Sequence, residues 1–155
     1  MSTLEFFKWC DSTWISQVIR DSTNIFPVVE VFHLFGLTLL LAVVTVVDMR
    51  ILGFGLRRQS IPAVAKGLEA WGVGAALLTI TTGILLFLSE AMKCYVNQAF
   101  PYKMGFLLAG IVLYFLTQRG ITKNTMSLGV MKVVAVLTLV VWYGVAIAGR
   151  AIAFV

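Results

Sequence analysis

Charged residues are scarce in this chain. Lys, Arg, Asp and Glu make up 12% of its 155 residues, whereas a soluble domain has about 25%. Hydrophobic residues make up 60% and the mean hydropathy is +0.97, which excludes a soluble monomer and a disordered chain. The 12 basic residues are spread along the sequence instead of gathering on one face, so nucleic-acid binding is also disfavoured. The composition predicts an integral membrane protein.

Cysteine and histidine are rarer still. The 2 cysteines, Cys10 and Cys94, are too few for a disulfide framework or a thiolate zinc site. The 1 histidine, His33, excludes bis-histidine haem ligation within a single chain. No GxSxG, HExxH, P-loop or GxGxxG motif occurs, and no serine or cysteine is placed to pair with the histidine. These absences favour a non-enzymatic protein.

Long apolar stretches separate the few charges. A bilayer core of about 30 Å needs about 20 helical residues. Stretches of suitable length predict spans over residues 25–49, 66–92, 101–118 and 128–150. The third is the shortest and crosses only if Lys103 extends its ammonium group to the headgroups. We therefore expect an all-α fold, a single domain over residues 1–155 built as a bundle of four transmembrane helices.

Residues 3–20 predict an amphipathic helix that lies on the membrane surface. On a helical wheel its apolar side carries Leu4, Phe7, Cys10, Trp14, Ile15 and Val18. Acidic residues within the segment distinguish it from a cleavable signal sequence, so we expect it to be retained.

Lys and Arg residues predict the orientation in the membrane. The connections after the first and third spans hold Arg50, Arg57, Arg58, Lys66, Arg119, Lys123 and Lys132, and the other side holds Lys8, Arg20, Lys93, Lys103 and Arg150. By the positive-inside rule the first group lies in the cytoplasm. Both termini are then expected outside.

Ionisable residues within the spans are the best guide to function, because charge at membrane depth is costly. Successive spans run in opposite directions, so the start of the first span and the end of the second share one membrane face. At this outer end we expect a cluster of Glu30, His33, Glu90, Lys103 and Arg150. Several interpretations of the cluster remain open.

The plainest interpretation is that these residues anchor the helices at the interface. A metal site is the second, because His33, Glu30 and Glu90 offer one nitrogen and two carboxylates, for example to a copper ion. A third is haem, with His33 as one axial ligand and a methionine, water or another copy of the chain supplying the other. A fourth is recognition of a quinone or lipid headgroup by Glu30, His33 and Lys103.

The inner end of the predicted bundle has its own ionisable residues. Asp48 and Glu69 are expected to meet there, with Arg50 close by and Gln118 within reach. We interpret Asp48, Arg50 and Glu69 as structural ion pairs that fix helix depth and register.

Three segments resemble a known family. They are Phe26–Gly36 with the pattern FPxxExxH, Asp48–Gly53 with the pattern DxRxLG, and Thr82–Phe87. They are similar to a family of small bacterial inner-membrane proteins catalogued as a domain of unknown function. The resemblance implies a four-span bacterial membrane protein in which Glu30, His33, Asp48 and Arg50 are the residues of interest, and it implies no activity. Taken with the orientation expected from the basic residues, it leads us to expect a protein of the bacterial cytoplasmic membrane with both termini on the periplasmic side. More remotely, the start of the first span resembles the membrane domain of copper-resistance D proteins.

We therefore expect a non-enzymatic membrane subunit or accessory protein whose outer cluster binds a haem, metal, quinone or partner. Small-residue pairs such as Gly105 with Ala109 and Gly144 with Ala148 leave surface for helix neighbours, so we expect a homo-oligomer or a larger complex in the lipid bilayer. The competing hypothesis is a small transporter of protons, ions or small molecules. A transporter predicts a wet bundle axis, whereas an accessory protein predicts a dry one.

Overall fold

The computed structural model describes the backbone of residues 2–123 and 126–152, and the side chains as far as residue 149. The described residues form helices and no strand. The helices are α1 (Thr3–Asp11), α2 (Trp14–Asp21), α3 (Ile25–Leu52), α4 (Ile61–Ser89), α5 (Ala91–Val96), α6 (Ala99–Lys123) and α7 (Leu128–Ile152). The expected all-α fold is confirmed.

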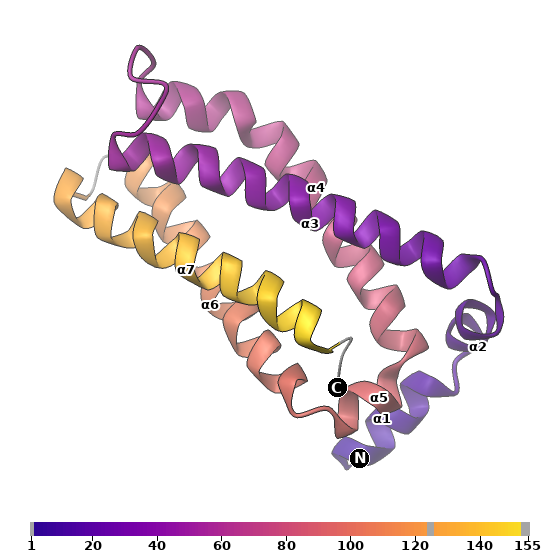
Figure 1. Ribbon diagram of the computed structural model, residues 1–155. Coiled ribbons are helices and arrows are strands. Elements are labelled where there is room, and N and C mark those ends of the chain that lie inside the picture. The colour runs from indigo at the N-terminus through magenta and orange to yellow at the C-terminus, as the bar shows by residue number, and fades with distance from the viewer. Residues whose placement is uncertain (1, 124–125, 153–155) are drawn as a thin grey trace.

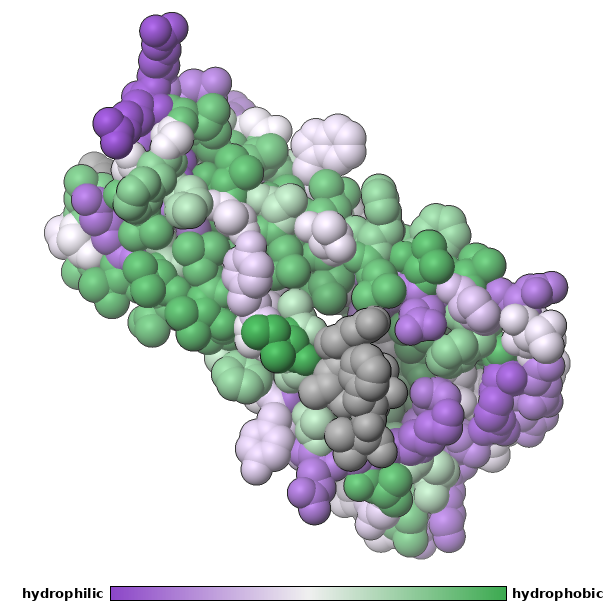
Figure 2. Space-filling model, in the orientation of Figure 1, coloured by the Kyte–Doolittle hydropathy of each residue, from purple (hydrophilic) through white to green (hydrophobic). Residues whose placement is uncertain are grey.

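Four of these helices, α3, α4, α6 and α7, are long and apolar enough to cross a membrane, which indicates a multi-pass membrane protein. In sequence order they form two antiparallel hairpins, α3 with α4 and α6 with α7 (Figure 1). The hairpins pack together mainly through α3 and α7, while α4 and α6 barely touch. Figure 2 shows an apolar surface along the helices, with hydrophilic residues concentrated at the two ends of the molecule.

The expected single amphipathic helix is in fact two helices. Thr13 starts a new helix by accepting a hydrogen bond from the Ser16 amide at 3.3 Å, and its hydroxyl also donates to the Cys10 carbonyl at 2.9 Å. Serine and threonine side chains compete for backbone groups in this way, so they favour helix ends over helix interiors. Because the chain turns at this point, Cys10 is buried while Trp14 is 76% exposed.

The N-terminal helices pack over the ends of the spans, beside the short helix α5. Phe7 of α1 makes ring contacts with Phe87 of α4, Tyr95 of α5 and Phe100 of α6, at centroid distances of 5.6, 5.3 and 6.4 Å. Such aromatic pairs contribute about 0.5–1.5 kcal/mol each beyond the apolar area that they bury. This cluster attaches the surface helices to both hairpins.

Local signals explain the turn between α3 and α4. Gly53 ends α3 in the left-handed conformation, with φ of 96°, and the Phe54 amide donates back to the Met49 carbonyl at 2.8 Å. Glycine tolerates this conformation without steric cost. Ser60 caps the start of α4, and Pro62 follows in its first turn. The glycine of the DxRxLG pattern is thus a helix terminator.

The interior of the bundle is filled by two apolar clusters. Near the α3–α4 turn lie Val47, Ile51, Ala65, Ile121, Met131 and Ala135. Midway along the spans lie Leu40, Val44, Ala75 and Trp142. The second cluster places an apolar layer between the two ends that carry ionisable residues.

Candidate functional site

His33 is fixed to the neighbouring helix through one ring nitrogen. Its Nδ1 atom lies 3.1 Å from the Thr79 carbonyl oxygen and 3.0 Å from the Thr82 hydroxyl. The Thr82 hydroxyl donates its own hydrogen to the Leu78 carbonyl at 2.6 Å. Both partners therefore offer lone pairs to Nδ1, so Nδ1 carries the proton and Nε2 keeps its lone pair.

Two glycines allow this contact between α3 and α4. A Cβ atom on Gly83 would lie 3.1 Å from the imidazole carbon Cε1 of His33. A Cβ atom on Gly36 would lie 2.7 Å from the Thr79 hydroxyl and 3.1 Å from the Thr79 amide nitrogen. Small residues let membrane helices approach closely. The glycines thus set the separation at which His33 reaches its partners.

Lys103 and Glu30 lie near the imidazole. Both are close enough for their charges to act on His33. Lys103 is half-buried at the start of α6, and a Cβ atom on Gly149 would lie 3.5 Å from its ammonium nitrogen. Within the described part of the chain, neither this ammonium nor the Nε2 atom of His33 has a hydrogen-bond partner. The end of the bundle near His33, which we expect to face outward, therefore presents one free acceptor and one free cationic donor among the described residues.

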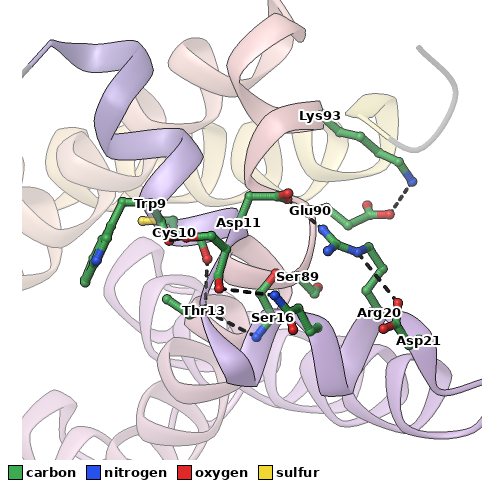
Figure 3. A network of polar contacts seen from close by, with 12 residues as sticks. Trp9, Cys10, Asp11, Thr13, Ser16, Arg20, Asp21, Ser89, Glu90 and Lys93 are labelled. Carbon is green, nitrogen blue, oxygen red and sulfur yellow. Dashed lines mark hydrogen bonds and ion pairs between the residues drawn. The ribbon is translucent and has the colours of Figure 1, made fainter.

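Glu90 belongs to a different set of contacts. It pairs with Lys93 on α5, in the polar network at the end of the bundle that Figure 3 shows. In the same network Arg20 joins Asp11 of α1 at 2.9 Å. The Arg20–Asp11 pair joins the two surface helices to each other, while the Glu90–Lys93 pair is local to the start of α5.

The residues predicted for the outer end therefore fall into two groups. Glu30 and Lys103, predicted with His33 for a cofactor headgroup, lie near enough for their charges to act on the imidazole, but Glu30 is exposed and no hydrogen bond or ion pair among the described residues joins the three. His33, Glu30 and Glu90, the set predicted for a metal, do not form a metal-binding group: the described residues contain no group of three or more His, Cys, Asp or Glu side chains able to hold an ion. The Arg150 side chain lies outside the described residues.

The inner end differs from the expected ion pairs. Asp48 is 1% exposed, and its Oδ2 atom has no hydrogen-bond partner. Arg50 points instead to the α3–α4 turn, where its Nε donates to the Gln59 carbonyl at 2.8 Å. Glu69 is exposed and lines the same small cavity as Asp48 and Gln118. Among the described ion pairs, none joins Asp48, Arg50 and Glu69.

Sequence reasoning missed the role of Thr82. The Thr82–Gly83 pair stands within a segment that resembles the family, but nothing in its spacing shows that it faces His33 from another helix. The sequence feature that could have indicated this role is a threonine next to a glycine within a predicted span, because the pair combines a hydrogen-bonding group with room for a neighbouring helix.

Comparison with known proteins gives a family and no function. Residues 6–155 match the model of a protein family that is described as a family of unknown function, DUF6644. No curated protein matches the chain, and no solved structure does.

Proposed function

Because the chain belongs to the DUF6644 family of unknown function, we propose a function from its own residues: a non-enzymatic membrane subunit that binds the polar head of a membrane-soluble cofactor at its outer end. The binding residues are His33, Lys103 and Glu30. We place the protein in the bacterial cytoplasmic membrane, with both termini on the periplasmic side, as a homo-oligomer or part of a larger complex.

One observation carries this proposal: the imidazole of His33 is held by its Nδ1 atom, which leaves Nε2 free. A histidine whose orientation and tautomer are fixed by a backbone carbonyl is preorganised to present its other nitrogen to a ligand.

A quinone headgroup is the ligand class that this set of groups fits best. The ammonium of Lys103 can donate a hydrogen bond to a quinone oxygen, and Nε2 of His33 can accept one from the hydroxyl of the reduced form. The apolar tail of such a molecule would remain among the lipid-facing side chains of the spans.

The test is a titration of the purified full chain with a short-chain quinone, in which quenching of tryptophan fluorescence reports binding. We expect saturable quenching that weakens about 10-fold or more in Lys103→Gln, because a lost charge-assisted hydrogen bond costs about 1.5–3 kcal/mol. Lys123→Gln, at an exposed position at the far end of the same helix, is the matched control and should bind as the wild type does.

Two substitutions of His33 make the test specific. Asparagine places an amide nitrogen near the position of Nδ1 and has nothing at Nε2, so His33→Asn should keep the contact with α4 and lose the quinone. Wild-type affinity in His33→Asn would contradict the role of Nε2, and the absence of saturable quenching in the wild type would reject the quinone.

Haem is the second candidate, and the same nitrogen favours it. An imidazole whose Nδ1 donates to a backbone carbonyl is a suitable axial ligand through Nε2. The visible spectrum of the protein purified from iron-replete cells decides the matter, because bound haem gives a Soret band that His33→Asn should abolish. A spectrum without that band removes haem from consideration.

The transporter hypothesis finds less support. Leu40, Val44, Ala75 and Trp142 form an apolar cluster in the middle of the bundle, and this cluster supports an accessory protein over a transporter. Equal flux of protons or ions across liposome membranes with and without the protein would agree with an accessory role.

A further inference from the structure

A small polar cavity lies between the four spans, near the α3–α4 turn and far from His33. Its polar lining consists of Asp48, Glu69, Tyr114, Thr117, Gln118 and Thr138, which come from all four helices. Its free space is about 20 Å³, which is room for about one water molecule or one small ion.

Asp48 is the residue that requires an explanation. Its side chain is 1% exposed, and Oδ2 has no partner within the described residues. A buried carboxyl group without a hydrogen bond is costly, and a carboxylate in a membrane interior needs a counter-charge. Arg50, the cation nearest in sequence, is bound to Gln59 instead. The cavity beside Asp48 is therefore incomplete without a ligand.

The hydroxyl hydrogens of the two lining threonines are already donated to backbone carbonyl groups. Thr117 donates to the Leu113 carbonyl at 3.0 Å, and Thr138 donates to the Val134 carbonyl at 2.8 Å. Their oxygens can therefore offer only lone pairs to a ligand. Gln118 adds an amide oxygen and Tyr114 adds a hydroxyl oxygen. Hard cations prefer such a set of carboxylate, hydroxyl and amide oxygens.

The charge of the site selects the kind of cation. One buried carboxylate balances one positive charge, and Glu69, the other carboxylate of the lining, is exposed. The described residues also lack the group of three or more acidic or histidine side chains that a divalent metal commonly has. We propose that Asp48 and the oxygens around it bind a sodium ion, a site independent of the one proposed at His33.

Thermal unfolding of the purified full chain tests this site. At constant ionic strength, replacing choline chloride by sodium chloride should raise Tm by about 3–6 °C when sodium is 10-fold above its dissociation constant. Asp48→Asn should abolish this sodium dependence, because the neutral amide needs no counter-ion. Asp21→Asn, an exposed carboxylate at the opposite end, should retain it.

Equal Tm values in sodium and choline would overturn the proposal. So would a Tm that responds to pH alone, which would mean that the lining groups able to titrate, Asp48, Glu69 and Tyr114, bind only a proton. If Asp48→Asn fails to fold, binding of radioactive sodium to the wild type decides instead. Bound label that unlabelled sodium displaces and choline does not supports the site, and no saturable label refutes it.

Discussion

The two nitrogens of His33 have different partners, so substitutions should separate stability from ligand binding. Glutamine extends its amide toward the position of Nε2 and cannot also satisfy Thr79 and Thr82. We expect His33→Gln to lower the free energy of unfolding by about 1–3 kcal/mol, the cost of leaving a part-buried group unpaired. His33→Asn, which keeps a donor near Nδ1, should lose less.

Denaturant or thermal unfolding in detergent, with both variants measured side by side, checks this order of stability. Equal losses would mean that the bond from Nδ1 to α4 contributes little to the fold.

At the same scale, Cys94 should be an unreactive thiol. It lies on α5, outside the spans. Burial is the main cause that raises its pKa, and the nearby carboxylate of Glu90 raises it further, while the charges of Lys103 and Lys93 lower it. A raised pKa leaves less thiolate at neutral pH, so alkylation should be slower than for a free thiol and should accelerate as the pH rises.

Alkylation rates across a pH series, measured in a Cys10→Ser background, check this prediction. Glu90→Gln should shift the rate profile toward lower pH, since it removes one of the influences that raise the pKa. A profile that does not move would show that the Glu90 carboxylate does not contribute to the raised pKa of the thiol.

The hydrogen-bond and contact partners of each site residue were the part of the site that could not be predicted from the sequence. Hydropathy and spacing identified His33, Glu30 and Lys103 as residues to examine, because charge within a span is rare. Which atom each one meets depends on how far each helix rotates about its axis. A rotation of a few tens of degrees about the axis of α3 decides whether Asp48 faces the interior of the bundle or its surface.

At the scale of the elements, the close contact of α3 with α4 should be sensitive to a single methyl group. Gly36→Ala would bring Cβ to within 3.1 Å of the Thr79 backbone nitrogen, so the helices must move apart. We expect a loss of about 1–3 kcal/mol in the free energy of unfolding, as for other overpacked interiors.

Gly74→Ala is the matched control on α4, because nothing lies within 4 Å of the Cβ that it would add. It should leave stability unchanged or raise it slightly through its higher helix propensity. Thermal unfolding of both variants measures the difference, and equal Tm values would show that the helices tolerate a wider separation.

The elements themselves were largely predictable. Apolar length alone located the four spans, since a helix that crosses a bilayer must satisfy its backbone internally. The break at Ser12 and Thr13 was not foreseen, because the helical wheel registers apolar periodicity and ignores the competition of hydroxyl groups for the backbone. The short helix α5 was missed too, since its six residues show no clear periodicity.

For the whole molecule, the single span α4 between them places the α3–α4 turn on the opposite side of the membrane from the α5–α6 connection. In a chain without its native cysteines, Gln98→Cys should react with a membrane-impermeant thiol reagent in cells with a permeabilised outer membrane. Arg58→Cys should react only in inverted vesicles, because basic loops stay in the cytoplasm.

Both positions are exposed, so burial does not explain a difference between them. Labelling of both from one side would contradict the four-span topology. Labelling with the two sides exchanged would reverse the proposed orientation and leave the topology intact.

The arrangement of the spans as two sequence-adjacent hairpins also bears on biogenesis. Each hairpin makes most of its contacts within itself, while the seam between hairpins depends mainly on α3 and α7. Each half can therefore enter the bilayer as a unit during translation and dock afterwards. The chain divided at the α5–α6 connection should then reassemble from two separately synthesised fragments.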